Sequence, residues 1–408
     1  MNTTLHHALR LLAAPLALAL AAAAAVAGPI DPPPGPVAPT FKTLHQVEPR
    51  IPVSSATTPG GTGEVYRITQ PGSYYLTENL VGVAGRQGIR ITASNVTLDL
   101  GGFSLLGVEN SGRGIDLQGD LENITLVNGV ISGWGNHGID AFQDVNCTFR
   151  DLKLTDNGRD GLNAGDRATV VRCTAEGNGE QGLDVGNDCV LRDCVATGNA
   201  EHGIRAGNGA AVSGCVARNN GGSLNAGIQV GAGAAVTHCA AAENEGYGIR
   251  TGPSGVITGC SAVSNGVTGI FAGAASTVTG CTANSNSVHG IDATERSTVS
   301  GCTALGNGGA TGAGIRVFFG ATVTGCTAAG NSTGILADAG DNRIDSNSIT
   351  SNTRGISITS GGCLIVRNSF SGNTISIFQG GGPSAIGAIL DVSGSEITTP
   401  NAWANVLY

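Results

Sequence analysis

The chain has 408 residues, among them 66 glycines and one methionine, and only 4% of its residues are aromatic. Its 30 Asp and Glu residues outnumber 21 Lys and Arg residues, which gives a net charge of −9, and no run of basic residues occurs. Nucleic acid is therefore not an expected partner, because phosphates bind basic surfaces. Collagen is excluded because the glycines lack a three-residue period, and disorder because the Val, Ile and Ala positions are regular.

Residues 1–27 have the features of a secretory signal peptide. His6, His7 and Arg10 precede a long apolar run that ends in Ala25-Val26-Ala27, a typical processing site. An uncleaved membrane anchor is the alternative, because the run nearly reaches the length that spans a bilayer. We expect cleavage, and hence an exported protein without a membrane span, located in the periplasm, at the cell surface or outside the cell. A proline-rich spacer follows at residues 28–40.

Residues 41–80 are expected to form an N-terminal cap and the first strands, and residues 81–374 a series of repeats. An uncovered end of such a series would present unpaired strand edges, so a second cap is needed. Residues 375–408 lose the repeat pattern and are enriched in large apolar side chains, as a C-terminal cap requires: Ile375, Ile377, Phe378, Ile389, Leu390, Trp403 and Tyr408.

One unit, V-x-x-C-x-A-x-x-N, recurs eight times between residues 170 and 331. Its cysteines follow one another at steps of 21 or 24 residues: Cys173, Cys194, Cys215, Cys239, Cys260, Cys281, Cys302 and Cys326. A period of this length predicts a solenoid, in which each repeat buries its apolar side chains only by stacking on the next.

A Gly-Ile or Gly-Leu pair extends the repeat beyond the cysteines and occurs thirteen times between Gly88 and Gly355. We therefore predict thirteen coils, each made of short β segments separated by polar turns. Leucine-rich repeats need a leucine framework that is missing here. Left-handed β-helices are built from hexapeptide units, and the repeat length of 21 residues is not a multiple of six. The pattern predicts an all-β right-handed parallel β-helix, with asparagines in left-handed turn conformation and their amides hydrogen-bonded from coil to coil.

The eight column cysteines are expected to be buried free thiols that pack as small hydrophobic groups. Neighbouring coils would place their Cα atoms about 4.8 Å apart, but parallel Cβ directions would force a disulfide to distort the backbone. A single file of thiols also cannot surround one metal ion tetrahedrally. The sequence leaves open the state of Cys147, Cys189 and Cys363, which lie outside the column.

Three segments resemble the first coils of exported right-handed β-helix repeat proteins of the pectin-lyase-like superfamily. They are YRITQPGSYYLTENL (66–80), GIRITASNVTLDLGGFSLLG (88–107) and ITLVNGVISGWGNHGID (124–140), and the tail NAWANVLY (401–408) resembles the closing segment of the same group. The resemblance covers residues 41–408 and implies the architecture. It implies no particular chemistry, because most proteins of this subgroup have no assigned activity.

The residue that follows each Gly-Ile or Gly-Leu pair should point outward, because its predecessor points inward. This outward column reads Arg90, Asp116, Asp140, Asn163, Asp184, Arg205, Gln229, Arg250, Phe271, Asp292 and Arg316. One interpretation is a solvated ladder of weak ion pairs, with Asp184 beside Arg205 and Asp292 beside Arg316. The other is catalytic: Asp116 and Asp140 would lie one coil apart, where one carboxylate could raise the pKa of the other.

His137 and Asp184 complete the candidate catalytic set with Asp116 and Asp140, inside a cluster that also contains Asp144, Asp160 and Asp166. Polygalacturonases of the resembled superfamily use aspartates and a histidine on one face, but their paired Asp-Asp and Arg-x-Lys motifs are absent here. His137, His202 and His289 also occupy a turn position that tolerates Gln, Tyr and Thr. No cofactor is expected; the run DAGDNRID (338–345) offers oxygen ligands for calcium but matches no complete loop motif.

Three functions are compatible with these features. The first is non-catalytic binding or organisation of an extracellular polysaccharide or surface polymer, for which Trp134, Tyr247, Phe271, Phe318 and Phe319 are the available aromatic platforms. The second is a polysaccharide lyase or hydrolase that uses the N-terminal carboxylates, and the third is a structural or adhesive rod. Two enlarged corners, 221–226 and 308–313, could frame a binding surface or be tolerated insertions. The sequence does not indicate an oligomeric state.

Overall fold

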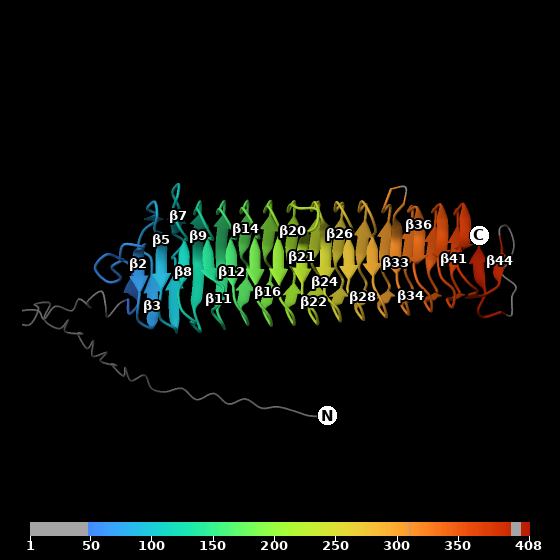
Figure 1. The fold of residues 1–408 in the computed structure, drawn as a ribbon, viewed down its shortest axis with the longest axis horizontal. Coiled ribbons are helices and arrows are strands. Elements are labelled where there is room, and N and C mark those ends of the chain that lie inside the picture. The colour runs from blue at the N-terminus through green and yellow to red at the C-terminus, as the bar shows by residue number, and fades with distance from the viewer. Residues whose placement is uncertain (1–47, 310, 393–400) are drawn as a thin grey trace, which may run out of the picture. The chain divides into compact units, whose positions relative to one another are not determined.

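The computed structural model describes residues 48–309, 311–392 and 401–408. The chain divides into two units, Met1–Pro49 and Arg50–Tyr408. The expected signal peptide (1–27), the spacer (28–40), the start of the N-terminal cap (41–47) and residues 393–400 of the C-terminal cap lie outside the described residues. Arg50–Tyr408 is a parallel β-solenoid in which the described residues form 45 strands (Figure 1). The described part contains no helix that could cross a membrane.

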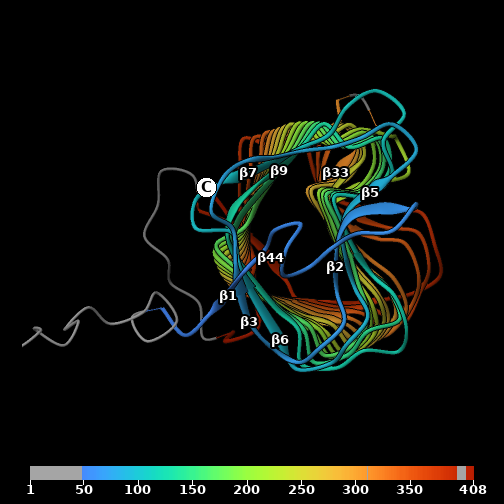
Figure 2. The same cartoon turned by 90° about the vertical axis from the view of Figure 1, so that its left-hand side faces the viewer.

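Three ladders of parallel strands run along the solenoid, and Figure 2 shows them around a common interior. The third ladder forms a sheet of its own and carries the Gly-Ile and Gly-Leu pairs. Its strands are β2 (Glu64–Ile68), β5 (Gln87–Ile91), β8 (Ile115–Leu117), β10 (Ile139–Ala141), β12 (Leu162–Ala164), β15 (Leu183–Val185), β18 (Ile204–Ala206), β21 (Ala226–Val230), β24 (Tyr247–Thr251), β27 (Ile270–Ala272), β30 (Ile291–Ala293), β33 (Ala313–Val317), β36 (Thr333–Ala337), β39 (Arg354–Ile358) and β42 (Ile375–Gln379).

The first two ladders belong to one sheet, because the long strands β9 and β11 take part in both. The first ladder consists of β1 (Ile51–Pro52), β3 (Gly72–Tyr75), β6 (Val96–Asp99), β9 (Thr125–Ser132), β11 (Thr148–Thr155), β13 (Thr169–Val171), β16 (Val190–Arg192), β19 (Ala211–Ser213), β22 (Ala235–Thr237), β25 (Val256–Thr258), β28 (Thr277–Thr279), β31 (Thr298–Ser300), β34 (Thr322–Thr324), β37 (Arg343–Asp345), β40 (Leu364–Val366) and β43 (Ala385–Ile386). The second ladder adds β4 (Leu80–Val81), β7 (Ser104–Leu106), β14 (Thr174–Glu176), β17 (Val195–Thr197), β20 (Val216–Arg218), β23 (Ala240–Ala242), β26 (Ser261–Val263), β29 (Thr282–Asn284), β32 (Thr303–Leu305), β35 (Thr327–Ala329), β38 (Ser348–Thr350), β41 (Ser369–Ser371), β44 (Ile389–Asp391) and β45 (Asn405–Leu407).

The predicted number of thirteen coils is too small, since the third ladder has 15 strands within the described residues. The two additional strands are β2 and β42, which pair with β5 and β39 but lack the Gly-Ile or Gly-Leu pair. Both lie in segments that the sequence assigns to the caps. Counting Gly-Ile and Gly-Leu pairs missed these two strands, because the glycine is required by close packing within the inner coils and not by strand pairing itself.

That steric requirement is set by a ladder of asparagines that runs from Asn157 to Asn373. At Asn265, the side-chain Nδ2 donates to Asn286 Oδ1 at 2.9 Å and to the Ala241 carbonyl at 3.1 Å. A Cβ on Gly269 would lie 2.4 Å from Asn286 Nδ2, so glycine is needed where the ladder passes. The predicted coil-to-coil amide bonds are confirmed.

The predicted backbone conformation of these asparagines is wrong. The left-handed residue is the one that precedes each ladder asparagine, such as Gly177 with φ 67°, Ser264 with φ 55° or Ser285 with φ 54°. The asparagine needs a regular conformation because its side chain must reach inward, where Asn265 is 0% exposed.

The eight column cysteines are buried free thiols, as predicted, and Cys147, Cys189 and Cys363 are buried free thiols as well. The eight column cysteines stand at the bend between the first and second ladders, whereas Cys147, Cys189 and Cys363 directly precede strands of the first ladder. From Cys215 to Cys326, each column sulfur also accepts a backbone N–H from the preceding coil, as Cys281 Sγ does from the Cys260 nitrogen at 3.4 Å. Asn347 takes over the same role after Cys326, with its Oδ1 2.8 Å from the Cys326 nitrogen.

Candidate functional site

The outward column of the third ladder begins with a chain of ion pairs. Arg90 places its Nε 2.8 Å from Asp116 Oδ2 and its Nη1 3.0 Å from Glu64 Oε2. The Glu64 side chain is fully buried and that of Asp116 is 5% exposed, so Arg90 compensates two carboxylates that have left water. The prediction of a solvated ladder is wrong at this end, because arginines from adjacent positions cover the carboxylates.

Asp116 and Asp140 are register partners on β8 and β10, as their spacing predicts. Arg113, in the turn before β8, lies between them. Its Nη1 is 3.0 Å from Asp116 Oδ1, and its Nε is 2.7 Å from Asp140 Oδ2. The two carboxylates therefore share a guanidinium, which offsets the mutual repulsion on which the acid/base hypothesis for this pair depends.

Asp144 is a buried carboxyl in the turn after β10, with an exposed fraction of 1%. Burial raises the pKa of the Asp144 carboxyl to about 6, and the nearby negative charge of Asp140 raises it further. Its Oδ1 accepts the Leu121 backbone N–H at 2.7 Å, which lowers the pKa in part. This residue supports the turn beside Asp140.

His137 is buried beside Asp160, with Nδ1 3.1 Å from Asp160 Oδ2 and 3.3 Å from the Asp160 backbone nitrogen. His202 and His289 occupy the same turn position and use Nδ1 to accept a backbone N–H of the next coil, from Ala226 at 2.9 Å and from Ala313 at 3.1 Å. Burial lowers the pKa of both His202 and His289 to about 4. The three histidines therefore share a structural role in the turns.

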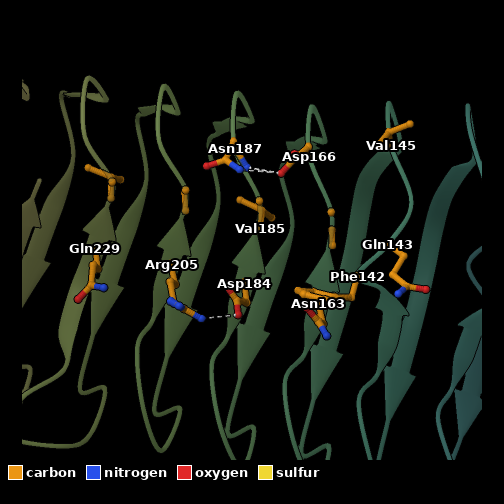
Figure 3. Close-up of a pocket in the computed structure, with 17 residues that line it drawn as sticks. Phe142, Gln143, Val145, Asn163, Asp166, Asp184, Val185, Asn187, Arg205 and Gln229 are labelled. Atoms are coloured by element: carbon orange, nitrogen blue, oxygen red, sulfur yellow. Dashed lines mark hydrogen bonds and ion pairs between the residues drawn. The ribbon is translucent and has the colours of Figure 1, made fainter. Parts of the chain in front are cut away.

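Asp184 lies one coil before Arg205, as predicted, and the two form an ion pair of 3.0 Å between Asp184 Oδ2 and Arg205 Nη1 (Figure 3). Burial raises the pKa of the Asp184 carboxyl to about 6, whereas the Arg205 charge lowers it. The pair lines a hollow of 550 Å³. In Figure 3, the side chains of Asn163, Asp184, Arg205 and Gln229 lie in a row, one from each successive strand.

This hollow is the middle part of a groove along the third ladder, hereafter the ladder groove. A hollow of 310 Å³ at Arg90, Arg113, Asp116 and Asp140 shares Phe142 and Gln143 with the middle part. A hollow of 370 Å³ at Arg250 and Phe271 shares Gln229 and Val230 with it. The three hollows together extend from β5 to β27, which is eight strand spacings or roughly 38 Å. The enlarged corner at 221–226 contributes no lining residue to the ladder groove.

Phe142 is an aromatic residue of the ladder groove that the sequence analysis missed. Its side chain is 67% exposed and lines both the first and the middle hollow. A signal was present: Phe142 follows the Gly-Ile-x-Ala strand at a position where the next coils carry a glycine, such as Gly165 or Gly186. Trp134, in contrast, was predicted to be an available platform and is only 1% exposed, because its ring fills the interior beside Gly88.

Arg316 forms a second charged group further along the outward column. Its Nη1 lies 3.5 Å from Oδ2 of Asp292, the predicted partner, and its Nε lies 3.1 Å from Oδ2 of Asp338. Burial raises the pKa of the Asp292 carboxyl to about 6, and Asp292 Oδ1 has no hydrogen-bond partner among the described residues. None of the hollows of the ladder groove includes this group.

Two family descriptions match the chain. Residues 72–213 match the right-handed β-helix region, and residues 208–385 match the family described as periplasmic copper-binding protein (NosD). The fold of the chain is therefore a right-handed parallel β-helix. This β-helix assignment agrees with the resemblance noted in the sequence.

Solved structures with similar coils include the A-module of the mannuronan C-5 epimerase AlgE4 of Azotobacter vinelandii, with 16% identity, a TM-score of 0.45, and coverage of 78% of this chain and 91% of that one. Tailspike protein 3 of bacteriophage CBA120 has 15% identity, a TM-score of 0.43, and coverage of 83% and 60%. The periplasmic alginate epimerase AlgG has 11% identity, a TM-score of 0.36, and coverage of 87% and 80%. Likenesses this low carry no argument about function. No curated protein matches the chain in sequence.

One of the two family descriptions names copper as a bound metal. Copper prefers thiolate, thioether and imidazole ligands. Among the described residues, no group of three or more His, Cys, Asp or Glu side chains is placed to hold a metal ion. The column thiols lie in single file, and burial raises the pKa of the Cys173 thiol to about 12, which opposes the thiolate form. The described residues therefore do not fit a copper site.

Proposed function

We propose that the ladder groove binds an extended polysaccharide or a similar surface polymer without turning it over. The observation that carries this proposal is the continuity of the groove from β5 to β27. One outward side chain per coil faces it at a constant rise, so a polymer of repeating units can make an equivalent contact at each coil. A small molecule would occupy only one of the three hollows.

The lining of the groove supports a sugar polymer. Asn163, Gln143 and Gln229 offer amide donors and acceptors for hydroxyl groups. Phe142 and Phe271 offer apolar ring surface at two separate places along the groove. Ring faces on which the apolar side of a sugar packs, next to amides that bind its hydroxyls, form a site of the kind that small ligands use.

The test is retention of neutral and acidic polysaccharides by the purified exported chain in affinity electrophoresis. The wild type is expected to retain at least one polymer, and the double variant Phe142→Ala/Phe271→Ala to retain it about tenfold more weakly. Phe378→Ala is the matched control, because Phe378 is exposed in the coil of β42, beyond the end of the groove. Equal loss in the control would contradict the assignment of binding to the groove.

A catalytic function, as polysaccharide lyase or hydrolase, is the second candidate and rests on Asp184. This carboxyl has a pKa of about 6 and lines the middle hollow, where it could exchange a proton with a bound polymer. Asp116, Asp140 and His137 would be its partners in that case. Release of unsaturated or reducing ends by the wild type, and its loss in Asp184→Asn, would establish turnover and reject the non-catalytic proposal.

Retention of a polymer without release of product would reject the catalytic function. Absence of both retention and product would favour the third candidate, a structural or adhesive rod. We also infer export, in line with the expected signal peptide and with the periplasmic family that residues 208–385 match. N-terminal sequencing of the protein from the producing cell is expected to begin at Gly28. An intact residue 1 in the exported fraction would contradict cleavage.

A further inference from the structure

The outward column contains five arginines when Arg67 on β2, the register partner of Arg90, is counted with it. Four of them are paired with a carboxylate: Arg67 with Glu64, Arg90 with Glu64 and Asp116, Arg205 with Asp184, and Arg316 with Asp292 and Asp338. The fifth is Arg250 on β24, and no carboxylate of the described residues forms an ion pair with it. Its ladder neighbours are uncharged, since Gln229 precedes it and Phe271 follows it in register.

Two aromatic rings hold the Arg250 guanidinium. Its Cζ lies 5.4 Å from the centre of the Tyr247 ring and 5.6 Å from that of Phe271, and the two rings meet edge to face at 5.8 Å. Cation–π contacts of this kind fix the guanidinium without neutralising its charge. The N–H groups of the guanidinium therefore remain available to a ligand.

Arg250 lines the third hollow of the ladder groove, together with Gln229 and Phe271. The Gln229 Oε1 atom is buried without a hydrogen-bond partner among the described residues. The hollow thus presents a free cation, an unused acceptor and a ring face within 370 Å³. Arginine binds the oxygens of carboxylates and sulfates through two parallel N–H groups, and the acceptor suits an adjacent hydroxyl.

We propose that the third hollow is a subsite for one anionic group, a carboxylate or a sulfate ester, carried by an otherwise uncharged stretch of polysaccharide. This inference rests on the proposed function and adds the chemistry of the ligand. The rest of the groove supplies no second free cation: the first hollow has Arg90 and Arg113 against Asp116 and Asp140, with buried Glu64 behind Arg90. In the middle hollow, Arg205 is offset by Asp184.

The charge of the groove therefore selects against a polymer that carries an anion on every sugar. Such a chain would place acidic groups next to Asp116, Asp140 and Asp184, where repulsion acts at close range. A chain with scattered acidic substituents can place one of them at Arg250 and neutral sugars elsewhere. Specificity of this kind depends on the unfavourable contacts as much as on the favourable one.

The experiment compares the wild type with Arg250→Gln in affinity electrophoresis. The carboxylate probe is a xylan with scattered glucuronic acid side groups, tested beside the same xylan after reduction of its carboxylates to alcohols. The sulfate probe is a galactan with scattered sulfate esters, tested beside its desulfated form, and polygalacturonate is the uniformly acidic probe. Arg192→Gln is the control, because Arg192 is exposed on β16 of the other sheet and the substitution changes the net charge equally.

We expect the wild type to bind at least one sparsely acidic probe about tenfold more tightly than its neutral form, since a hydrogen bond to a charged group is lost with the acid. Arg250→Gln is expected to bind both forms equally, and Arg192→Gln to behave as the wild type. The inference is overturned if Arg250→Gln keeps the preference, or if polygalacturonate is the tightest ligand. Equal retention of acidic and neutral forms by the wild type would reject the anion subsite but leave groove binding intact, whereas retention of no probe would reject both.

Discussion

Replacing Asn265 by alanine tests how strongly the asparagine ladder holds the coils together. The Asn265 side chain is 0% exposed and takes part in four hydrogen bonds: Oδ1 accepts from Asn244 N at 3.2 Å and from Asn244 Nδ2 at 2.9 Å, and Nδ2 donates to the Ala241 carbonyl at 3.1 Å and to Asn286 Oδ1 at 2.9 Å. The substitution leaves the Asn244 N–H buried without an acceptor. Three lost bonds at about 1 kcal/mol each and an unsatisfied donor at about 1–3 kcal/mol predict a loss of about 4–6 kcal/mol in the free energy of unfolding.

Urea unfolding measures this loss, and hydrogen exchange of the Asn244 amide locates it. Asn284→Ala is the matched control, since Asn284 lies on β29 outside the asparagine ladder and its buried Oδ1 has no hydrogen-bond partner among the described residues. The control is expected to change the free energy of unfolding by less than about 0.5 kcal/mol. The reasoning is refuted if Asn265→Ala and Asn284→Ala unfold at the same urea concentration, or if the Asn244 amide stays protected.

Three further predictions concern buried groups. The thiols should resist Ellman's reagent in the folded protein and all react in denaturant, because burial makes them inaccessible to the reagent. The raised pKa of Asp144 means that the folded state holds the proton more tightly than the unfolded chain, so stability attributable to this group falls as the pH rises from about 4 to about 6. Asp144→Asn should therefore exceed the wild type by about 2 kcal/mol at pH 7 and equal it at pH 3.5, as measured by urea unfolding at both pH values. Arg113→Met should cost about 3 kcal/mol in the same assay, because it leaves Asp116 buried with one cation fewer, and adding Asp116→Asn should restore part of the loss.

Each of these predictions has an outcome that contradicts it. Rapid labelling of several thiols in the folded state would show that the solenoid interior is open. Asp151→Asn is the control for Asp144, because Arg172 holds the pKa of the exposed Asp151 below its usual value and the pH dependence should have the opposite sign. The same sign in both variants would reject the electrostatic argument, and an additive loss in Arg113→Met/Asp116→Asn would show that the two side chains do not interact.

The register of the fold could be predicted from the sequence because a repeat of 21 or 24 residues fixes which side chains stack. The pairs Asp116 with Asp140 and Asp184 with Arg205 followed directly from that register. Side chains outside the columns could not be placed in this way. Arg113 reaches the carboxylates from a turn, and its position between them depends on side-chain length and direction that spacing does not report.

The ladder groove could not be predicted from the sequence for a related reason. Its depth depends on the small residues of the turns, such as Gly165 and Gly186, relative to the bulk of Phe142. The repeat spacing placed Arg250 and Phe271 in the outward column, but it did not show that Tyr247 lies against both side chains. Periodicity predicts contacts between equivalent positions, whereas a site arises where one coil departs from its neighbours.

The central claim, that the ladder groove is the binding surface, is tested most directly by a crystal structure of the protein with an oligosaccharide of the polymer it retains. Density for the sugar chain is expected along the third ladder between β5 and β27, in contact with Phe142 and with its acidic group at Arg250. Density on the outer face of the first two ladders, or across the enlarged corners and outside the groove, would contradict the claim.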